Sequence, residues 1–222
     1  MKYQIEGGSL PVLIVNLEVG EKLITEGGAM SWMSGNMKMD TSSGGGVKKV
    51  FGRMFSGESL FHNIYEPIGK EGMIALASKF PGAIKALEIT PDKPVIIQKR
   101  AFLACEPRVE LSVHWQKKIG VGLFGGEGFI MQKLSGNGLA FIEIDGYEKQ
   151  YELQENEEMI ISTGYLVAMS ASCSFNVRSV GTVKNALFGG EGIFNAVVRG
   201  PGMVIVQSMP IGNLMHGLSL KK

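Results

Sequence analysis

The sequence predicts an all-β protein built of three tandem units, and three observations support this. Residues 123–129 (LFGGEGF) recur 64 residues later as 187–193 (LFGGEGI), and residues 54–60 (MFSGESL) form a weaker earlier copy. Short apolar runs that alternate with polar residues stand between glycine turns along the chain, which is typical of strands. Only one segment shows a clear helical period. Recurrence at a fixed spacing indicates a repeated structural unit.

A pair of strands joined by a turn opens each unit in this interpretation, after a first short strand at residues 2–6. The runs are 10–18 and 22–26 around Gly20, 87–89 and 95–97 around Asp92, and 151–153 and 159–161 around Asn156. We predict a hairpin at each place, because Gly, Asp and Asn all tolerate positive φ. Ile24, Ile97 and Ile161 then occupy equivalent positions.

Further strands complete each unit. They lie around residues 29–39, 101–113 and 165–177, and after the glycine turns at Gly72, Gly138 and Gly202, in 73–77, 139–144 and 203–206. We expect one compact body over 1–222, with units 1–83, 84–146 and 147–210 and a tail at 211–222. The units would be sandwich-like or barrel-like and would pack around a pseudo-threefold axis, because pairing with the next unit covers each open sheet edge.

One segment, residues 46–55, is predicted to be a short helix. Val47, Val50, Phe51, Met54 and Phe55 share one face, and Lys48, Lys49 and Arg53 lie elsewhere. The preferred interpretation is that its apolar face packs inward and caps the β unit. The alternative is a membrane or partner surface formed by Val47, Lys48, Lys49, Phe51 and Arg53, since basic amphipathic segments can lie on membranes. Other helices are expected to be short and minor.

Composition describes a folded protein without a basic excess. The 222 residues are 45% hydrophobic and 19% charged, with a net charge of +1. Nucleic-acid binders usually carry a surplus of cations, so the charge balance argues against that class. Cys105 and Cys173 form no CxxC pair and are predicted to be buried or half-buried thiols in a reducing compartment. With no signal peptide and no 18-residue apolar run, we expect a cytoplasmic protein.

The recurring motif carries one glutamate in each copy, namely Glu58, Glu127 and Glu191. Three such carboxylates could converge near the axis and bind a cation, or each could accept hydrogen bonds from turn amides of its own unit. The second interpretation is preferred, because it needs no ligand and repeats with the fold. The three histidines have no metal-binding spacing and no GxSxG stretch exists, so we predict no metal, no cofactor and no catalytic residue. Trp32 and Trp115 look like core or interface residues.

Several stretches together resemble a known family. They are residues 28–33 (GAMSWM), 58–63 (ESLFHN), 80–82 (FPG), 190–194 (GEGIF) and 200–210 (GPGMVIVQSMP). In this order they resemble the altered-inheritance-of-mitochondria family in its bacterial form. The resemblance implies three TRAP-like units, similar to the tryptophan RNA-binding attenuation protein, with a double-stranded β-helix architecture. It also implies a trimer assembled into a ring, with no known catalytic residues or cofactor. The mitochondrial location of eukaryotic relatives, and RNA or tryptophan binding, are not carried over.

Two functions are expected from these features. The first is a non-enzymatic structural or scaffold protein, a ring-forming homotrimer that binds a protein partner or a membrane surface. The alternative is a small-ligand or nucleic-acid binding module that uses clefts between units near Glu58, Glu127 and Glu191.

Overall fold

The structure is a computed structural model that describes residues 1–41, 62–117, 129–179 and 194–210. These residues form nineteen β-strands and two short 3-10 helices, and none of them forms an α-helix. The predicted all-β class is therefore confirmed. The segment 46–55, expected to be helical, lies outside the described residues.

The strands fall into three sets of six that succeed one another along the chain. The first strand set comprises β2 (Val12–Leu17), β3 (Leu23–Glu26), β4 (Trp32–Met33), β5 (Met37–Thr41), β6 (His62–Pro67) and β7 (Gly72–Ala77), preceded by β1 (Lys2–Glu6). The second comprises β8 (Gly82–Ile89), β9 (Val95–Gln98), β10 (Phe102–Cys105), β11 (Val109–Lys117), β12 (Phe129–Gly136) and β13 (Gly138–Asp145), with η1 (Lys99–Ala101) before β10. The third comprises β14 (Glu148–Leu153), β15 (Glu158–Ser162), β16 (Leu166–Ser170), β17 (Ser174–Ser179), β18 (Phe194–Arg199) and β19 (Gly202–Gln207), with η2 (Thr163–Tyr165) before β16.

One pairing scheme occurs in all three sets. The first and third strands of a set both pair with its sixth strand, as β8 and β10 do with β13. The second and fourth strands both pair with the fifth, as β9 and β11 do with β12. Two further pairings, β3 with β10 and β9 with β16, join consecutive sets. The expected boundary after residue 83 falls inside β8, whereas the boundary after residue 146 falls between β13 and β14.

The predicted hairpins are wrong in one respect. β2 and β3 are consecutive, but β2 pairs with β1 and β7 while β3 pairs with β6 and β10. The same separation applies to β8 and β9 and to β14 and β15. Gly20 and Asn156 do adopt positive φ, at 93° and 64°, whereas Asp92 does not. A tight turn reverses the chain, and here it carries the chain from one sheet to the next.

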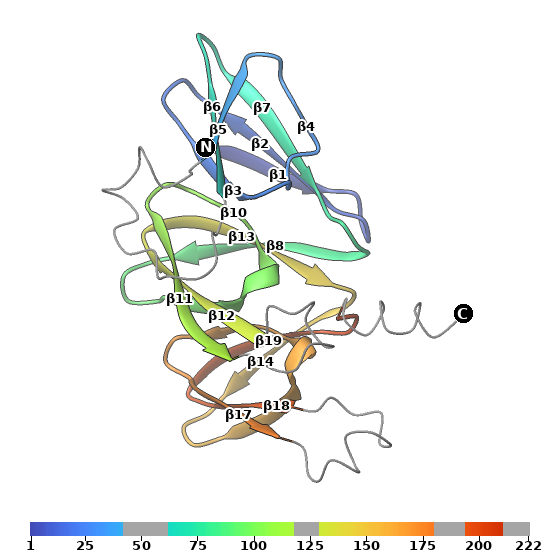
Figure 1. The fold of residues 1–222 in the computed structure, drawn as a ribbon, viewed down its shortest axis with the longest axis vertical. Helices are drawn as coiled ribbons and strands as arrows, with labels where there is room; N and C mark the ends of the chain where they lie inside the picture. Colours follow the sequence, from blue (N-terminus) through green and yellow to red (C-terminus); the bar gives the residue numbers. More distant parts are fainter. Residues whose placement is uncertain (42–61, 118–128, 180–193, 211–222) are drawn as a thin grey trace, which may run out of the picture.

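Four antiparallel sheets succeed one another along the long axis of the molecule (Figure 1). Their strand orders are β1-β2-β7-β4 in sheet 1, β5-β6-β3-β10-β13-β8 in sheet 2, β11-β12-β9-β16-β19-β14 in sheet 3 and β15-β18-β17 in sheet 4. Sheets 2 and 3 each combine three strands from one set with three strands from the next set. Sheets 1 and 4 each contain strands of one set only, apart from the preceding strand β1 in sheet 1.

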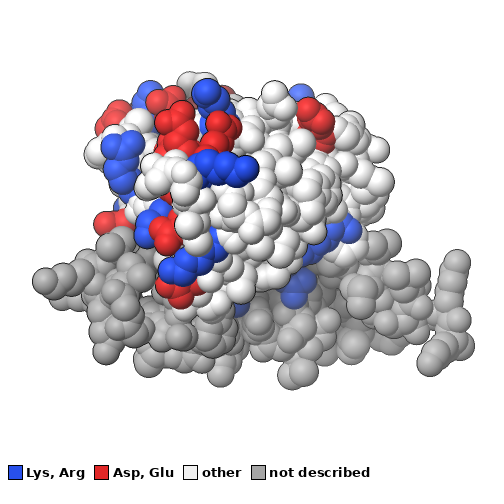
Figure 2. Space-filling view, turned by 90° about the horizontal axis from the view of Figure 1, so that it is seen from above, with Lys and Arg blue, Asp and Glu red and all other residues white. Residues whose placement is uncertain are grey.

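Sheet 1 forms the end of the molecule that Figure 2 presents. Charged side chains gather toward one side of this view, and uncharged residues cover most of the rest of the described surface. Residues 27–36, which include β4, contain no charged residue. The part of this end that contains β4 is therefore uncharged.

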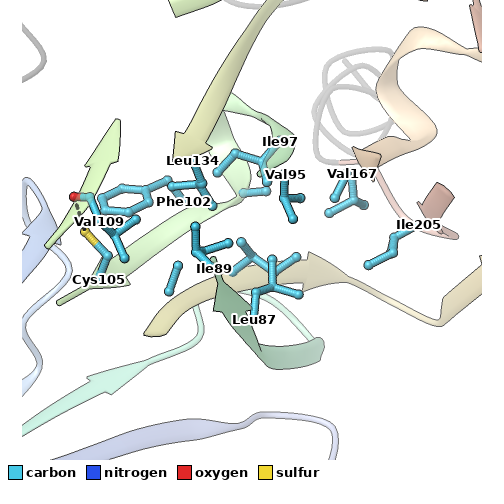
Figure 3. Close-up of a cluster of buried hydrophobic side chains, with 14 of the residues drawn as sticks. Leu87, Ile89, Val95, Ile97, Phe102, Cys105, Val109, Leu134, Val167 and Ile205 are labelled. Atoms are coloured by element: carbon cyan, nitrogen blue, oxygen red, sulfur yellow. Dashed lines mark hydrogen bonds between the residues drawn. The ribbon is translucent and has the colours of Figure 1, made fainter. Parts of the chain in front are cut away.

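Three hydrophobic cores fill the spaces between successive sheets. In the middle core, Leu87 and Ile89 of sheet 2 face Val95, Ile97 and Leu134 of sheet 3 (Figure 3). The first core lies between sheets 1 and 2 and the last between sheets 3 and 4. Each core draws side chains from two sheets, so each sheet buries its apolar side chains against another sheet.

Among the described strands, the row of sheets does not close on itself. We expected a pseudo-threefold arrangement in which every edge is covered, but no described pairing links β4 in sheet 1 to β15 in sheet 4. Sheets packed face to face lie about 10 Å apart, so stacking four of them separates the first and last sheets. The outer edges of β4, at one end of the row, and of β15, at the other, have no partner strand among the described residues.

The buried Gln132 provides a test of the middle core. Gln132 is 1% exposed, and neither its Oε1 nor its Nε2 has a hydrogen-bond partner among the residues that the structure describes. A buried amide without partners costs about 1–3 kcal/mol. We therefore expect Gln132→Leu to raise the free energy of unfolding by about that amount, measured by urea denaturation. The matched control is Asn63→Leu. Asn63 lies opposite Thr25 in the first set as Gln132 lies opposite Ile97 in the second, but its side chain accepts a hydrogen bond from Thr41 (3.2 Å). An equal gain in both variants would contradict this account.

Candidate functional site

The candidate site consists of two open strand edges, that of β4 at one end of the row and that of β15 at the other. Their counterparts in the other sets, β10 and β16 for β4 and β3 and β9 for β15, pair with a strand of the neighbouring set. Sheet 4 (β15-β18-β17) corresponds to the half of sheet 2 made by β3-β6-β5. In sheet 1, β2-β7-β4 corresponds to the other half, β8-β13-β10. Sheets 1 and 4 thus contain complementary halves of the composite sheet that occurs twice inside the molecule.

The register of pairing identifies equivalent residues in the three sets. Ile24 lies opposite Ile64, Ile96 opposite Lys133, and Ile160 opposite Val197. We call the pairing of β3 with β10 the first seam and that of β9 with β16 the second seam. Ile24 lies opposite Cys105 across the first seam, and Ile96 lies opposite Met169 across the second. The predicted equivalence of Ile24, Ile97 and Ile161 is therefore wrong by one residue. The error comes from aligning the turns, because Ile24 follows Gly20 by four residues whereas Ile97 and Ile161 follow Asp92 and Asn156 by five.

The three equivalent isoleucines differ greatly in exposure. Ile24 is 4% exposed and Ile96 1% exposed, but Ile160 on β15 is 61% exposed. The first two are covered because the next strand set pairs with their strands and packs over them. Ile160 has the same place in its own set and no later set to cover it.

The other open edge shows the same contrast. Trp32 on β4 is 48% exposed, whereas its counterparts Ala104 on β10 and Ala168 on β16 are fully buried. Large apolar side chains on open strand edges are typical of surfaces that pair with another strand, since isolated edges are otherwise protected by charge or by covering loops. The two edges therefore have the features of assembly surfaces.

Side chains from the sixth strand of a set hold the seams between sets. Glu143 at the end of β13 accepts hydrogen bonds from the Lys79 amide (2.8 Å) and the Ser78 hydroxyl (2.8 Å). Gln207 at the same position of β19 accepts one from the Asp145 amide (2.9 Å) and donates one to the Gly164 carbonyl (3.0 Å). In β7 this position is Ala77, which lies opposite Val12 as Glu143 lies opposite Ile84. Ala77 has no side-chain acceptor.

The first seam also contains an ion pair. The Glu26 carboxylate lies 3.0 Å from the Lys79 ammonium, and both side chains remain partly exposed. Partial burial raises the pKa of Glu26 above its ordinary value, and the charge of Lys79 opposes this rise. Glu143 adds a second carboxylate that further raises the pKa of Glu26. At the second seam the equivalent of Glu26 is the neutral Gln98, 7% exposed.

Both cysteines are buried, as predicted. Cys105 is 1% exposed, and burial with a smaller effect from the charge of Glu106 raises its thiol pKa to about 12. Cys173 is 6% exposed, and burial and Glu152 raise its pKa as well. A buried thiol with a raised pKa stays in the protonated, less reactive form at neutral pH.

The residues singled out from the sequence have different outcomes. Glu58, Glu127 and Glu191 lie outside the described residues, as do Val47, Lys48, Lys49, Phe51 and Arg53, so these hypotheses stay predictions. In the described part of the chain, no three His, Cys, Asp or Glu residues lie close enough together to hold a metal ion. None of the helices described there is long and apolar enough to cross a bilayer.

Of the two tryptophans, Trp115 is a core residue and Trp32 is an edge residue. Trp115 packs edge-on against Phe129 and Phe175, with ring centroids 5.9 Å and 5.2 Å away, in the last core. Trp32 lies on the open edge β4. Sequence reasoning missed Ile160, because its apolar character matches that of buried residues; only the pairing register distinguishes it.

The fold and the site define an all-β protein of stacked antiparallel sheets with complementary open edges at its two ends. The chain belongs to the family described as Mitochondrial biogenesis AIM24, which matches residues 3–209. A crystal structure of a protein from Streptococcus pyogenes is similar over 100% of this chain and 99% of that one, with 26% sequence identity and a TM-score of 0.82. A search of curated proteins found no match.

The ion pair at the first seam generates a prediction about pH. Because the pKa of Glu26 is raised on folding, its contribution to stability is fully present below its ordinary value of 4.5 and is lost as pH rises through the raised value. We expect Glu26→Gln, which copies the second seam, to stabilise the protein at pH 7 and to lose this advantage near pH 4. Urea midpoints measured across this range provide the check.

The reciprocal variant is the control. Gln98→Glu places a carboxyl in the more buried second seam, so it should destabilise at pH 7 and less so at pH 4. If Glu26→Gln lowers the urea midpoint at neutral pH, the ion pair with Lys79 outweighs the cost of burial and the proposed direction is incorrect.

Proposed function

We propose that the protein is a non-enzymatic structural or scaffold protein that assembles head to tail into a closed ring of three copies and binds partners on the ring surface. The observation that carries this proposal is the exposure of Ile160, 61% against 4% and 1% for its buried counterparts. A position that is core in two strand sets and open in the third is explained by a missing neighbour.

Completeness of the sheets supports the same proposal. Sheets 2 and 3 have six strands each, while sheets 1 and 4 have four and three. Joining the two outer sheets of different copies gives a sheet of the internal kind, extended by β1. The contact is heterologous, with two different surfaces, and such contacts produce closed rings or open filaments. A closed ring leaves neither edge exposed, which favours closure.

Three copies per ring are implied by the family resemblance, and the charge pattern is compatible with tight association. Residues 27–36, which include β4, contain no charged residue, and charged side chains gather on one side of this end of the row (Figure 2). At the other end, Glu158 of β15 is already paired with Arg199 (3.1 Å) and Arg178 (3.7 Å). Association would therefore bury apolar side chains and backbone groups rather than unpaired charges. We place this assembly in the cytoplasm as part of the same proposal.

The mass of the native particle tests the proposal. One chain has a mass of 24.0 kDa, so three copies correspond to 3 × 24.0 = 72.0 kDa. Light scattering or native mass spectrometry should find this species at micromolar concentration. Ile160→Glu should dissociate it, because assembly would bury an unpaired carboxylate at a cost of several kcal/mol.

Ile68→Glu is the matched control. Ile68 is 59% exposed, close to Ile160, but comes after β6 and lies on neither open edge. We expect this variant to keep the mass of the unmodified protein. A 24.0 kDa species for the unmodified protein would end the proposal, and equal dissociation by both variants would remove the role of β15.

A further inference from the structure

We propose that β15 of one copy pairs antiparallel with β4 of the next copy, with Ile160 opposite Met33 and Ile161 opposite Trp32. This inference rests on the proposed function and specifies its interface. It names the strands, the direction and the register, and each copy supplies residues that complete the core of its neighbour.

The register comes from the two internal seams. At the first seam Cys105 lies opposite Ile24, and Ala104 opposite Thr25. At the second seam Met169 lies opposite Ile96, and Ala168 opposite Ile97. Both seams are antiparallel and have the same alignment.

The strand β4 corresponds to β10 and β16 through its pairing with the sixth strand of its set. Met33 lies opposite Ile74, as Cys105 lies opposite Ala140 and Met169 opposite Val204. Met33 is thus the counterpart of Cys105 and Met169, and Trp32 that of Ala104 and Ala168. Transferring the seam register to this end places Met33 against Ile160 and Trp32 against Ile161 of the neighbouring copy.

The side chains then reach the correct cores. Residues opposite each other in an antiparallel pair project from the same face of the sheet. Ile24 and Cys105 both belong to the middle core, and Ile96 and Met169 both belong to the last core. Met33 already packs against the first core. Ile160 of the neighbouring copy would therefore enter the first core, and its exposed surface would be buried as that of Ile24 and Ile96 is.

The larger size of Trp32 fits the core that it would meet. At the internal seams this position is alanine, opposite Thr25 or Ile97. At the proposed seam it lies opposite Ile161, a member of the last core. Met159 and Tyr165 border that core and are only partly buried. An indole at this edge would cover side chains that sheet 4 alone leaves half exposed.

The shortness of β4 is consistent with this pairing. β4 has two residues, and the described pairing at the first seam also joins two residues of each strand. The backbone groups available on β4 are therefore sufficient for a seam of the internal kind.

Disulfide trapping tests the register. Opposite residues in an antiparallel pair have Cα atoms about 4.5–5.5 Å apart, which a disulfide can span. We expect the double variant Met33→Cys/Ile160→Cys to form disulfides between copies upon mild oxidation. On a non-reducing gel the single-chain band should shift to two-chain and three-chain bands. The native Cys105 and Cys173 are buried with raised thiol pKa values and should not react.

The control is a register displaced by one residue. Trp32→Cys/Ile160→Cys uses the same strands, but its two side chains point to opposite faces of the sheet and should not crosslink. Each single-cysteine variant should give at most a two-chain band, and an equimolar mixture of Met33→Cys and Ile160→Cys should give a mixed two-chain band.

Hydrogen exchange of the unmodified protein gives a second measurement that does not depend on the variants folding. Within residues 32–33 and 158–162, the amides that are not already bonded to β7 or β18 should be protected in the assembled protein and lose protection upon dilution to single chains. Internal seams should keep their protection, because they do not depend on assembly.

The outcomes separate this inference from the proposed function. If the protein forms a 72.0 kDa particle (3 × 24.0 kDa) but the variant does not crosslink and these amides are not protected, the proposed ring stands and the proposed pairing of β15 with β4 is overturned. A disulfide within one chain, without a gain in mass, would show that a single copy closes on itself and would overturn both. Crosslinking in the displaced register instead of the proposed one would overturn the register alone.

Discussion

The structure depends on one constraint, which is that every strand edge leaves a row of backbone donors and acceptors that must be paired or protected. Inside the chain the constraint is met by sharing. β3 pairs with β10, and β9 pairs with β16, so each of the two six-stranded sheets is formed from three strands of one set and three of the next. The outer sheets contain the same halves without their complements. The apolar edges at the two ends are thus a direct result of how the interior is paired.

Sharing also applies to the hydrophobic cores. The middle core contains Leu87 and Ile142 of sheet 2 together with Val167 and Ile205 of sheet 3, so it draws on both the second and the third strand sets. No strand set encloses a core by itself. Stability in such an arrangement comes from contacts between neighbouring sets, as it does in repeat proteins, and the terminal sets have the fewest contacts. In soluble repeat proteins such ends are capped by polar surfaces or joined to another copy.

Much of the fold was accessible from the sequence, because strand class depends on local pattern. Alternation and glycine turns predicted the strands, and Gly138 and Gly202 do begin β13 and β19 with positive φ. Sheet membership was not accessible. The turn at Gly20 identifies a change of direction, but the sheet that β3 joins depends on its distant partners, His62–Pro67 in β6 and Phe102–Cys105 in β10. The exposure of Ile160 likewise depends on which strand lies beside β15 in space and not on its neighbours in sequence.

The side-chain hydrogen bonds at the seams differ from one seam to the next, and this has a consequence for the exchange of subunits. Glu143 and Gln207 tie successive strand sets together with hydrogen bonds, while Ala77 at the matching place offers none. A ring joined through that third place would be weakest between polypeptides rather than within them. Subunits could then be interchanged between rings with their own folds intact, so old and newly made copies would mix without any chain having to denature.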